Sequence, residues 1–498
     1  MEEIELIDHS GVIPDSQEMP FSFEKREKFT DQGKDEIGYV EATKDYVLYA
    51  LPSVVGMLLR RSPDIINYLI IGQMDDPAYA SGLGLAIMTF NIVIASLGVG
   101  LSGGVETLCS QAFGMGNNYQ AGKIYPRAQV VMTCFFIPQA IILCFATPIL
   151  IATGQPQRSS ELAGEFIIIC LPGLWCWCQT ELLRRFLGAQ RVFHIIMNCQ
   201  IINCGLHIVW AFTFVFWLDL GYHGIIYATL ITFVMNFVLP YLYVTLNKSS
   251  VREGSWQFIS RDSFRDLGEY LSYGIPSMLM FAFEGWAFEF LTFMVGIFGE
   301  NELAVFVVCY NLVMYAYMVT VGFQLSINTL IGNSLGASKP KTARVYARVA
   351  LISVLFLFII LAGSFYSFRY KLASVFVSED LYDLFAYTLA MMVPLAFGDY
   401  LQSIGQGEIK AMGYQKWGTI ICLIGYWGIC IPLTYIFSFI LNFQVTGVLL
   451  GMPIGLLFVG VSFQIIIYRT NFEELSKDIV ARLRMSSSNL LEAQNGSQ

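Results

Sequence analysis

Long apolar runs separated by short polar links dominate this chain. We count twelve such segments, at 46–71, 79–113, 124–153, 160–188, 192–217, 222–246, 266–298, 302–332, 342–366, 383–410, 416–440 and 444–469. Apolar runs of about 20 residues have the length of an α-helix that crosses a bilayer. The pattern predicts an all-α integral membrane protein with twelve transmembrane helices. The one long polar link, 247–265, falls between the sixth and seventh segments.

Composition agrees with a chain whose solvent is mostly lipid. Charged residues make up 13% of its 498 residues and the mean hydropathy is +0.58; soluble domains carry about 25% charged residues. Residues 1–45 hold 13 Asp and Glu against 5 Lys and Arg. We therefore expect 1–45 to be a disordered, acidic cytosolic tail. At the other end, 470–498 is expected to form a cytosolic C-terminal tail.

Short matches show that the chain repeats itself. DYVLYALPS at 45–53 resembles EYLSYGIPS at 269–277, an offset of 224. Two further pairs follow in the same order, 108–127 with 330–348 and 184–191 with 409–416, at offsets of 222 and 225. A repeat of this length is half of a membrane transporter rather than a solenoid unit. The repeat predicts two parallel six-helix lobes, 46–246 and 266–469, joined by 247–265 around a central cleft.

The basic residues predict how the chain is oriented. With twelve spans, one set of loops and helix ends carries fifteen Lys and Arg, whereas the opposite set carries three. The positive-inside rule places both termini in the cytosol. The protein is then expected in the plasma membrane or in a vacuolar or vesicular membrane, which share this topology.

Three carboxyls inside apolar segments are the strongest candidates for chemistry. Glu284 and Glu289 lie in FAFEGWAFEFL, and Asp399 lies in PLAFGDYLQS. Ionisable groups within a membrane are costly, so they mark proton or cation sites by default. The alternative is that each carboxyl is neutral and hydrogen-bonded between helices. The functional reading predicts that protons and an organic cation compete for these groups.

The first segment carries Arg60, Arg61 and Asp64 in LLRRSPDIINYL, and the repeat aligns Arg60 with Glu284. One interpretation is an Arg–Asp pair three or four residues apart that faces the cavity wall. The other is a direct contact between Arg60 and Glu284 across the cleft. Pro63 is expected to kink this helix.

Other polar and small residues have weaker interpretations. Glu106 is expected to serve packing or capping near a cytosolic loop, and Glu408 and Lys410 are expected to snorkel to the interface. The glycines around 98–104 predict close helix packing. Near the carboxyls, Trp286, Tyr310 and Tyr317 suit cation–π contacts, although such aromatics more often face lipid or the core.

Several classes of site are not indicated. The eleven cysteines are scattered in apolar runs without metal-site spacing, there is no P-loop motif, and no nucleophile–base pair is visible among the four histidines. We expect no enzyme activity, no metal, no cofactor and no nucleic-acid partner.

Four segments together resemble the multidrug and toxic compound extrusion (MATE) transporters of eukaryotes. They are ETLCSQAFGMGN (106–117), FEGWAFEFL (283–291), NSLGASKPKTAR (333–344) and DYLQSIGQGEIKAMGYQKWG (399–418). The resemblance covers about 42–470 and implies two six-helix lobes that export organic cations or other metabolites against protons or sodium. It assigns coupling to Glu284, Glu289 and Asp399.

The same resemblance marks further positions and some departures. Its motif residues match Glu106, Gln111, Gly114, Asn333, Gly336 and Pro340, and Gln402 is expected in the substrate cleft. Asn67 stands where some bacterial relatives have a coupling acid in the first helix. Gly285 replaces a tryptophan, which opens space beside Glu284, and Lys410 replaces an arginine.

The sequence therefore predicts a secondary active antiporter, acting as a monomer on an organic cation or another small molecule by alternating access. One alternative is a MATE-like flippase for lipid-linked saccharides, which would need several basic residues in the cleft. A mainly negative cleft would favour cation export. Another alternative is a membrane receptor or membrane enzyme that does not transport.

Overall fold

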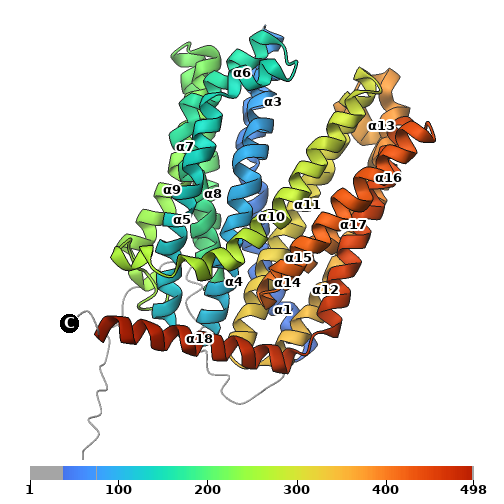
Figure 1. Cartoon of the computed structure of the whole chain (residues 1–498). Helices are drawn as coiled ribbons and strands as arrows, with labels where there is room; N and C mark the ends of the chain where they lie inside the picture. Colours follow the sequence, from blue (N-terminus) through green and yellow to red (C-terminus); the bar gives the residue numbers. More distant parts are fainter. Residues whose placement is uncertain (1–36, 75, 496–498) are drawn as a thin grey trace, which may run out of the picture. The chain divides into compact units, whose positions relative to one another are not determined.

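The computed structural model describes residues 37–74 and 76–495, and within this part of the chain every element is helical (Figure 1). Most of the predicted tail 1–45 lies outside the described residues. Its last residues belong to the first helix, which begins at Tyr39, so the tail boundary at residue 45 was set too late.

The helices of the first half are α1 (Tyr39–Arg60), α2 (Ser62–Ile71), α3 (Pro77–Phe90), α4 (Ser96–Gly114), α5 (Asn118–Cys144), α6 (Ala146–Ala152), α7 (Gln157–Ala189), α8 (His194–Phe212) and α9 (Gly221–Leu246). Those of the second half are α10 (Leu267–Gly296), α11 (Glu300–Gly336), α12 (Pro340–Phe376), α13 (Tyr382–Met391), α14 (Val393–Met412), α15 (Gln415–Cys422), α16 (Ile431–Tyr435), α17 (Gln444–Arg469) and α18 (Phe472–Asn495). A short π-helical turn, Asn91–Ala95, joins α3 to α4. A second one, Thr213–Trp217, extends α8 at its C-terminal end.

Within the described residues, eleven helices are long and apolar enough to cross a membrane. The remaining predicted span is the pair α1 and α2, which is interrupted at Arg61. Pro63 stands in the first turn of α2, where its missing N–H leaves no helical hydrogen bond unmade. The expected kink is therefore a break between two helices, and the predicted all-α, twelve-span architecture is confirmed.

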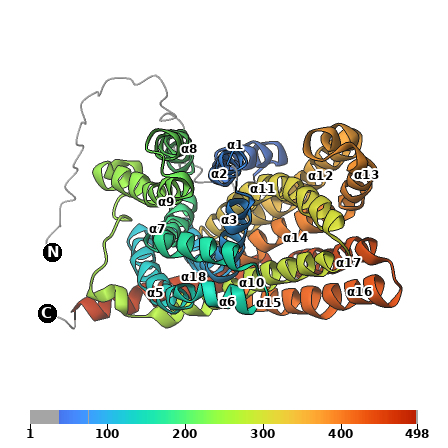
Figure 2. The ribbon, with the colours of Figure 1, turned by 90° about the horizontal axis from the view of Figure 1, so that it is seen from above.

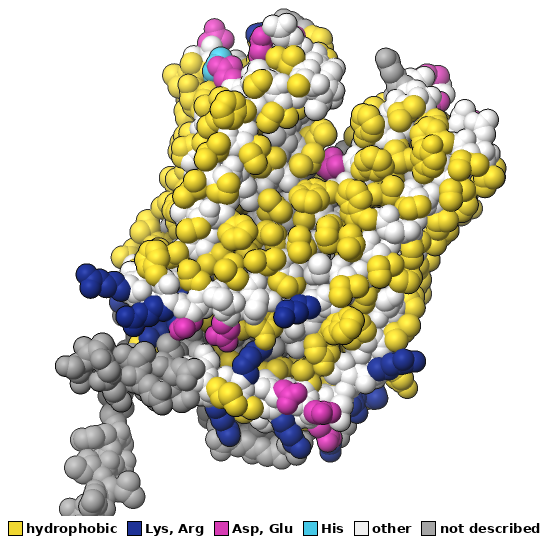
Figure 3. Space-filling model, in the orientation of Figure 1, with side chains coloured by type: hydrophobic (Ala, Val, Ile, Leu, Met, Phe, Trp, Pro, Cys, Tyr) yellow, Lys and Arg dark blue, Asp and Glu magenta, His cyan; other side chains and the backbone are white. Residues whose placement is uncertain are grey.

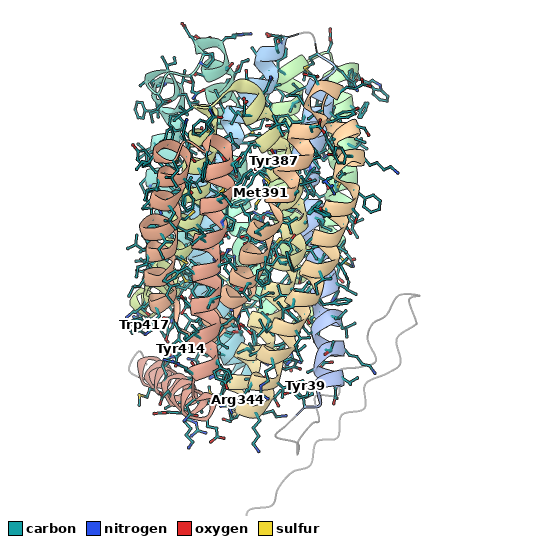
Figure 4. All side chains as sticks on the ribbon, turned by 90° about the vertical axis from the view of Figure 1, so that its right-hand side faces the viewer. Tyr39, Arg344, Tyr387, Met391, Tyr414 and Trp417 are labelled. Carbon is teal, nitrogen blue, oxygen red and sulfur yellow. The ribbon has the colours of Figure 1, made fainter. Side chains whose placement is uncertain are left out.

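The outer surface is suited to lipid. Apolar side chains on one face of α12, such as Ile352, Phe356 and Ile359, are exposed. Figure 3 shows apolar side chains over the middle of the visible face, with Lys and Arg gathered toward the end where α18 lies. Figure 4 places Tyr39 and Trp417 near this α18 end, as expected for aromatic side chains at a membrane interface. These features describe a multi-pass membrane protein.

The sequence repeat reappears as a reciprocal pair of contacts between the halves. A Cβ at Gly100 of α4 would lie 2.4 Å from Cα of Met278 on α10. A Cβ at Gly322 of α11 would lie 2.6 Å from the backbone nitrogen of Val54 on α1. Gly100 and Gly322 are repeat partners, as are Val54 and Met278, so the two crossings are copies of each other. Seen from above, α7, α8 and α9 lie on one side and α12, α13 and α17 on the other, with α1, α3, α10 and α11 between them (Figure 2).

The polar link 247–265 is anchored to the first lobe. Gln190 accepts a hydrogen bond from the backbone N–H of Arg252 at 2.9 Å, and Trp256 stacks on Tyr125 with centroids 5.6 Å apart. At its end, Asp266 pairs with Arg127 at 3.1 Å. The link is thus fixed along its length to helices of the first lobe.

The C-terminal tail contains an amphipathic helix that the hydropathy pattern did not reveal. Phe472, Leu475, Ile479 and Leu483 of α18 are buried. Arg482 donates hydrogen bonds to Gln111 of α4 and to Tyr273 of α10, so it reaches one helix from each lobe. The α18 helix therefore covers the end at which the lobes meet.

Candidate functional site

A cavity of about 250 Å³ lies between the lobes and is lined by residues of both. Figure 3 shows the visible face hollowed between the two helix groups, at the end away from α18. Of the candidate residues from the sequence, the following line this cavity: Arg60, Asp64, Asn67, Glu284, Glu289, Tyr310, Tyr317 and Asp399. The sequence thus located residues that are far apart in the chain but share one cavity.

Glu284 and Asp399 belong to one hydrogen-bonded cluster on the second-lobe wall. Gln402 donates from Nε2 to Glu284 Oε1 at 2.8 Å and lies 3.3 Å from Asp399 Oδ1. Gln406 donates to Glu284 Oε2 at 2.6 Å and to Gln402 Oε1 at 2.8 Å. Tyr317 completes the cluster, with its hydroxyl 3.4 Å from Glu284 Oε1. Gln402 therefore bridges the two carboxyls from behind the cavity wall.

The cluster is largely buried, and no ion pair among the described residues reaches it. Glu284 is 6% exposed and Asp399 is fully buried. The ion pairs seen among the described residues involve neither carboxyl, and the Oδ2 atom of Asp399 has no hydrogen-bond partner there. A buried carboxylate with no direct ion-pair partner is costly, so this pair is suited to gaining and losing a proton.

Gln406 was missed by sequence reasoning. Asp399, Gln402 and Gln406 are spaced three and four residues apart and so share one face of α14. That spacing was the available signal, because three polar residues on one face of a membrane helix need partners. Glu289 lines the same cavity as Glu284. Five residues turn an α-helix by about 140°, and no hydrogen bond between described residues joins Glu289 to the cluster.

Arg60 does not pair with Glu284. Its Nη1 lies 3.1 Å from Oε1 of Glu181, and its guanidinium lies 4.6 Å from the centroid of the Trp177 ring. Arg184 pairs with the same Glu181. The other interpretation, an Arg–Asp pair within the first span, is correct for Arg61, which pairs with Asp64 at 3.9 Å. Glu181, which sequence reasoning missed, is the centre of this cluster.

Charged residues near the α18 end are buried. Arg185 is buried and pairs with Glu106. Lys410 is 2% exposed and lines the cavity, and Glu408 is fully buried beside Gln464. The expectation that Glu408 and Lys410 snorkel was wrong, because α17 covers Glu408 and Lys410 lies between α4 and the cavity. Together the basic lining residues outnumber the acidic ones by five to four, so the cavity as a whole does not meet the charge criterion for cation export. The second-lobe wall alone is mainly negative, with three carboxyls and one lysine.

Asn67 is part of a polar network in the first lobe. Its Nδ2 donates to Thr229 at 2.9 Å, and its Oδ1 lies 3.1 Å from Nε2 of His207. The other ring nitrogen of His207 lies 2.7 Å from the hydroxyl of Thr232. His207 therefore takes its hydrogen-bond partners from α2 and α9, and the sequence did not reveal them.

The remaining motif residues lie at the α18 end, where the lobes meet. Gln111 donates to the carbonyl of Ala411 at 2.7 Å, and its repeat partner Asn333 donates to the carbonyl of Ala189 at 3.4 Å. Each lobe thus satisfies free carbonyls at the end of a helix from the other lobe. Pro340 begins α12, and Trp286 donates to the carbonyl of Ile92 at 3.2 Å rather than lining the cavity.

Two lobes of membrane helices around a shared cavity with ionisable side chains on both walls define a membrane transporter rather than an enzyme. The MatE family model matches the chain twice, at 52–213 and 276–436, which are 276 − 52 = 224 residues apart. The matches cover more than half of the chain and reproduce the offset of the sequence repeat. This chain belongs to the MatE family of multidrug and toxin extrusion transporters, as its sequence motifs indicated.

Individual relatives agree. Protein DETOXIFICATION 16 of Arabidopsis thaliana is 27% identical over 453 residues, covering 90% of this chain and 92% of that protein. Multidrug and toxin extrusion protein 1 of Danio rerio is 25% identical over 450 residues, covering 90% of this chain and 75% of that protein. The crystal structure of the eukaryotic MATE transporter AtDTX14 superposes with a TM-score of 0.85 at 24% identity, covering 90% of this chain and 100% of that one.

Proposed function

We propose that this transporter is a secondary active antiporter, which exports organic cations or related metabolites from the cytosol in exchange for protons. The observation that carries the proposal is the pair of buried carboxyls, Glu284 and Asp399, bridged by Gln402 at the cavity wall. Such a pair can hold protons or face a cationic substrate. Competition between the two for one site produces antiport.

The groups around Glu284 favour protons over sodium. Its oxygens accept hydrogen bonds from two side-chain amides, those of Gln402 and Gln406, and face the hydroxyl of Tyr317. A sodium ion binds oxygen ligands, as hard cations do, so both amides would have to turn before it could enter. A proton can bind a remaining lone pair of the carboxyl with both amides in place, although their hydrogen bonds favour the charged form.

The closed end of the cavity supports alternating access. The hydrogen bonds of Gln111 and Asn333 join the lobes at the α18 end. If basic loops mark the cytosol, this end is cytosolic and the site faces the external or luminal side of a plasma or vacuolar membrane. Protons from that side neutralise the carboxyl pair and release the substrate. Opening at the α18 end then returns the protons to the cytosol.

The proposal is tested in proteoliposomes by imposing a pH gradient and a sodium gradient separately. One pH unit supplies about 1.4 kcal/mol per proton, enough for about tenfold accumulation of substrate per proton exchanged. We expect uptake of a fluorescent cation to follow the pH gradient and to fall to background in Glu284→Gln and Asp399→Asn. Glu165→Gln is the control, because Glu165 is exposed and pairs with His223 outside the cavity. Flux that follows only sodium, or survives both cavity substitutions, contradicts the proposal.

A further inference from the structure

The first-lobe wall of the cavity carries a surplus of positive charge. Four arginines line it, namely Arg60, Arg61, Arg184 and Arg185. Three carboxylates pair with them, namely Glu106, Glu181 and Asp64. Glu181 is shared by two arginines, so one guanidinium charge on this wall is not balanced.

Arg61 is the least committed of the four. Glu181 is 2% exposed and is occupied by Arg60 at 3.1 Å. By contrast, the Arg61 side chain is 41% exposed, and its partner Asp64 is 34% exposed at 3.9 Å, the outer limit of an ion pair. Exposed pairs of this kind contribute little to stability. The Arg61 guanidinium is therefore open to a ligand in the cavity.

The position of Arg61 follows from the break in the first span. Helix α1 ends at Arg60 and α2 begins at Ser62, so Arg61 occupies the junction. A continuous membrane helix would have to bury or snorkel this charge. The junction instead presents it to the cavity, next to Arg60 and the ring of Trp177.

Charges of opposite sign face each other across this cavity. The second-lobe wall contributes three carboxyls, Glu284, Glu289 and Asp399, and one lysine, Lys410. The first-lobe wall contributes the four arginines and Asp64. Aromatic side chains line the space on both walls, among them Phe90, Trp177, Phe288 and Tyr310. A ligand that satisfies both walls carries an anionic group, a cationic group and an aromatic body between them.

We propose that Arg61, with Arg60 beside it, forms an oxyanion subsite, and that the transporter takes aromatic zwitterions, with a carboxylate, sulfonate or phosphate at the first lobe and a cationic nitrogen at the second. This inference rests on the proposed function for the role of the second-lobe carboxyls. Arginine suits the oxyanion because its planar fork binds two oxygens at once.

The two subsites divide the work of transport. Protons arriving at Glu284 and Asp399 displace the cationic end, because both bind the same carboxyls. The oxyanion end does not compete with protons, so the first lobe sets which substrates bind while the second lobe sets when they leave. Selectivity for the oxyanion is then measurable without any gradient.

Rhodamine B and its ethyl ester are matched probes, since they differ only in whether the carboxylate is free. Binding to the purified full-length protein is followed by fluorescence anisotropy at one pH. We expect the wild type to bind rhodamine B at least about tenfold tighter than the ester, as one charge-assisted contact predicts. Arg61→Gln should remove that preference and leave ester binding within about twofold. Arg261→Gln, in the exposed link, should change neither.

A second variant is expected to bind rhodamine B more tightly, a result that misfolding cannot produce. Asp64→Asn removes the carboxylate that competes for Arg61, so rhodamine B binding should tighten several-fold while ester binding does not. Equal affinity of the wild type for the two probes, binding of neither probe, or parallel loss of both in Arg61→Gln would overturn the subsite. Failure of pH-driven flux with the binding preference intact would instead refute the antiport mechanism and leave the subsite standing.

Discussion

Gly114 and Gly336 occupy the same place in the two lobes, and each lies against the backbone of the other lobe. A Cβ at Gly114 would lie 2.2 Å from the carbonyl oxygen of Asn333, and a Cβ at Gly336 would lie 2.0 Å from that of Gln111. Asn333 and Gln111 are themselves repeat partners. The closure at the α18 end is therefore built from two copies of one contact, related by a pseudo-twofold axis.

Gly336→Ala should weaken this closure, because a backbone oxygen cannot move aside as a flexible side chain would. We expect the free energy of unfolding in detergent to fall by about 1–3 kcal/mol, the usual cost of overpacking. Gly363→Ala is the control, since nothing lies within 4 Å of a Cβ there and alanine favours a helix by up to about 1 kcal/mol. Equal thermal stability of the two variants would contradict the tight contact.

Glu181→Gln should be among the most destabilising conservative changes in the first lobe. Glu181 is 2% exposed and holds two arginines, so its loss leaves their charges uncompensated beside the cavity. Removal of one partner from a buried pair costs about 3–5 kcal/mol. The exposed pair of Glu165 and His223 provides the comparison, and Glu165→Gln should cost under about 1 kcal/mol. The measurement is the unfolding free energy of each variant.

Gln406→Leu should impair transport more than folding. It removes the amide that donates to Glu284 at 2.6 Å, and a hydrogen bond to a charged group contributes about 1.5–3 kcal/mol, or about 10- to 150-fold in rate. Gln464→Leu removes a similar bond to the buried Glu408, which does not line the cavity. A flux assay in proteoliposomes should separate the two. A similar loss in both variants would mean that Gln406 acts only through folding.

Gly285→Trp should narrow the range of substrates. Gly285 lines the cavity beside Glu284, and a Cβ there would lie 3.7 Å from that of Ser96, which is ordinary contact. The first atom therefore fits, and the indole must occupy cavity space. We expect flux of a rhodamine-sized cation to fall at least about tenfold, the effect of one lost apolar contact, while flux of the small tetramethylammonium ion stays within about twofold. Equal effects on both cations would show that the indole turns away.

The hydropathy pattern predicted most of the fold because a bilayer imposes its thickness on every span. The hydropathy pattern also identified Glu284 and Asp399, because a carboxyl within an apolar run is easy to recognise. It failed at residues whose environment depends on other helices. Lys410 stands close enough to a helix end to look like a snorkelling side chain, yet it lines the cavity.

Side-chain partners that come from distant segments could not be predicted from the sequence either. Glu181 precedes two arginines in ELLRR, and only the folded chain shows that it also holds Arg60 from another helix. His207 lies in an apolar run, and its partners Asn67 and Thr232 come from α2 and α9. Helix α18 has too many charges for a hydropathy search, so its amphipathic face went unnoticed.

The attachment of the link 247–265 to the first lobe bears on how the halves can rock. A free loop of this size would be a slack tether, whose ends could separate by tens of ångströms. Here the link contacts the first lobe as far as Asp266, which pairs with Arg127 and has a positive φ of 54°. Helix α10 begins at the next residue. Only the peptide unit between Asp266 and Leu267 is therefore free to act as a hinge between the lobes. Any rotation of the second lobe about this hinge moves α10, the helix that carries Glu284.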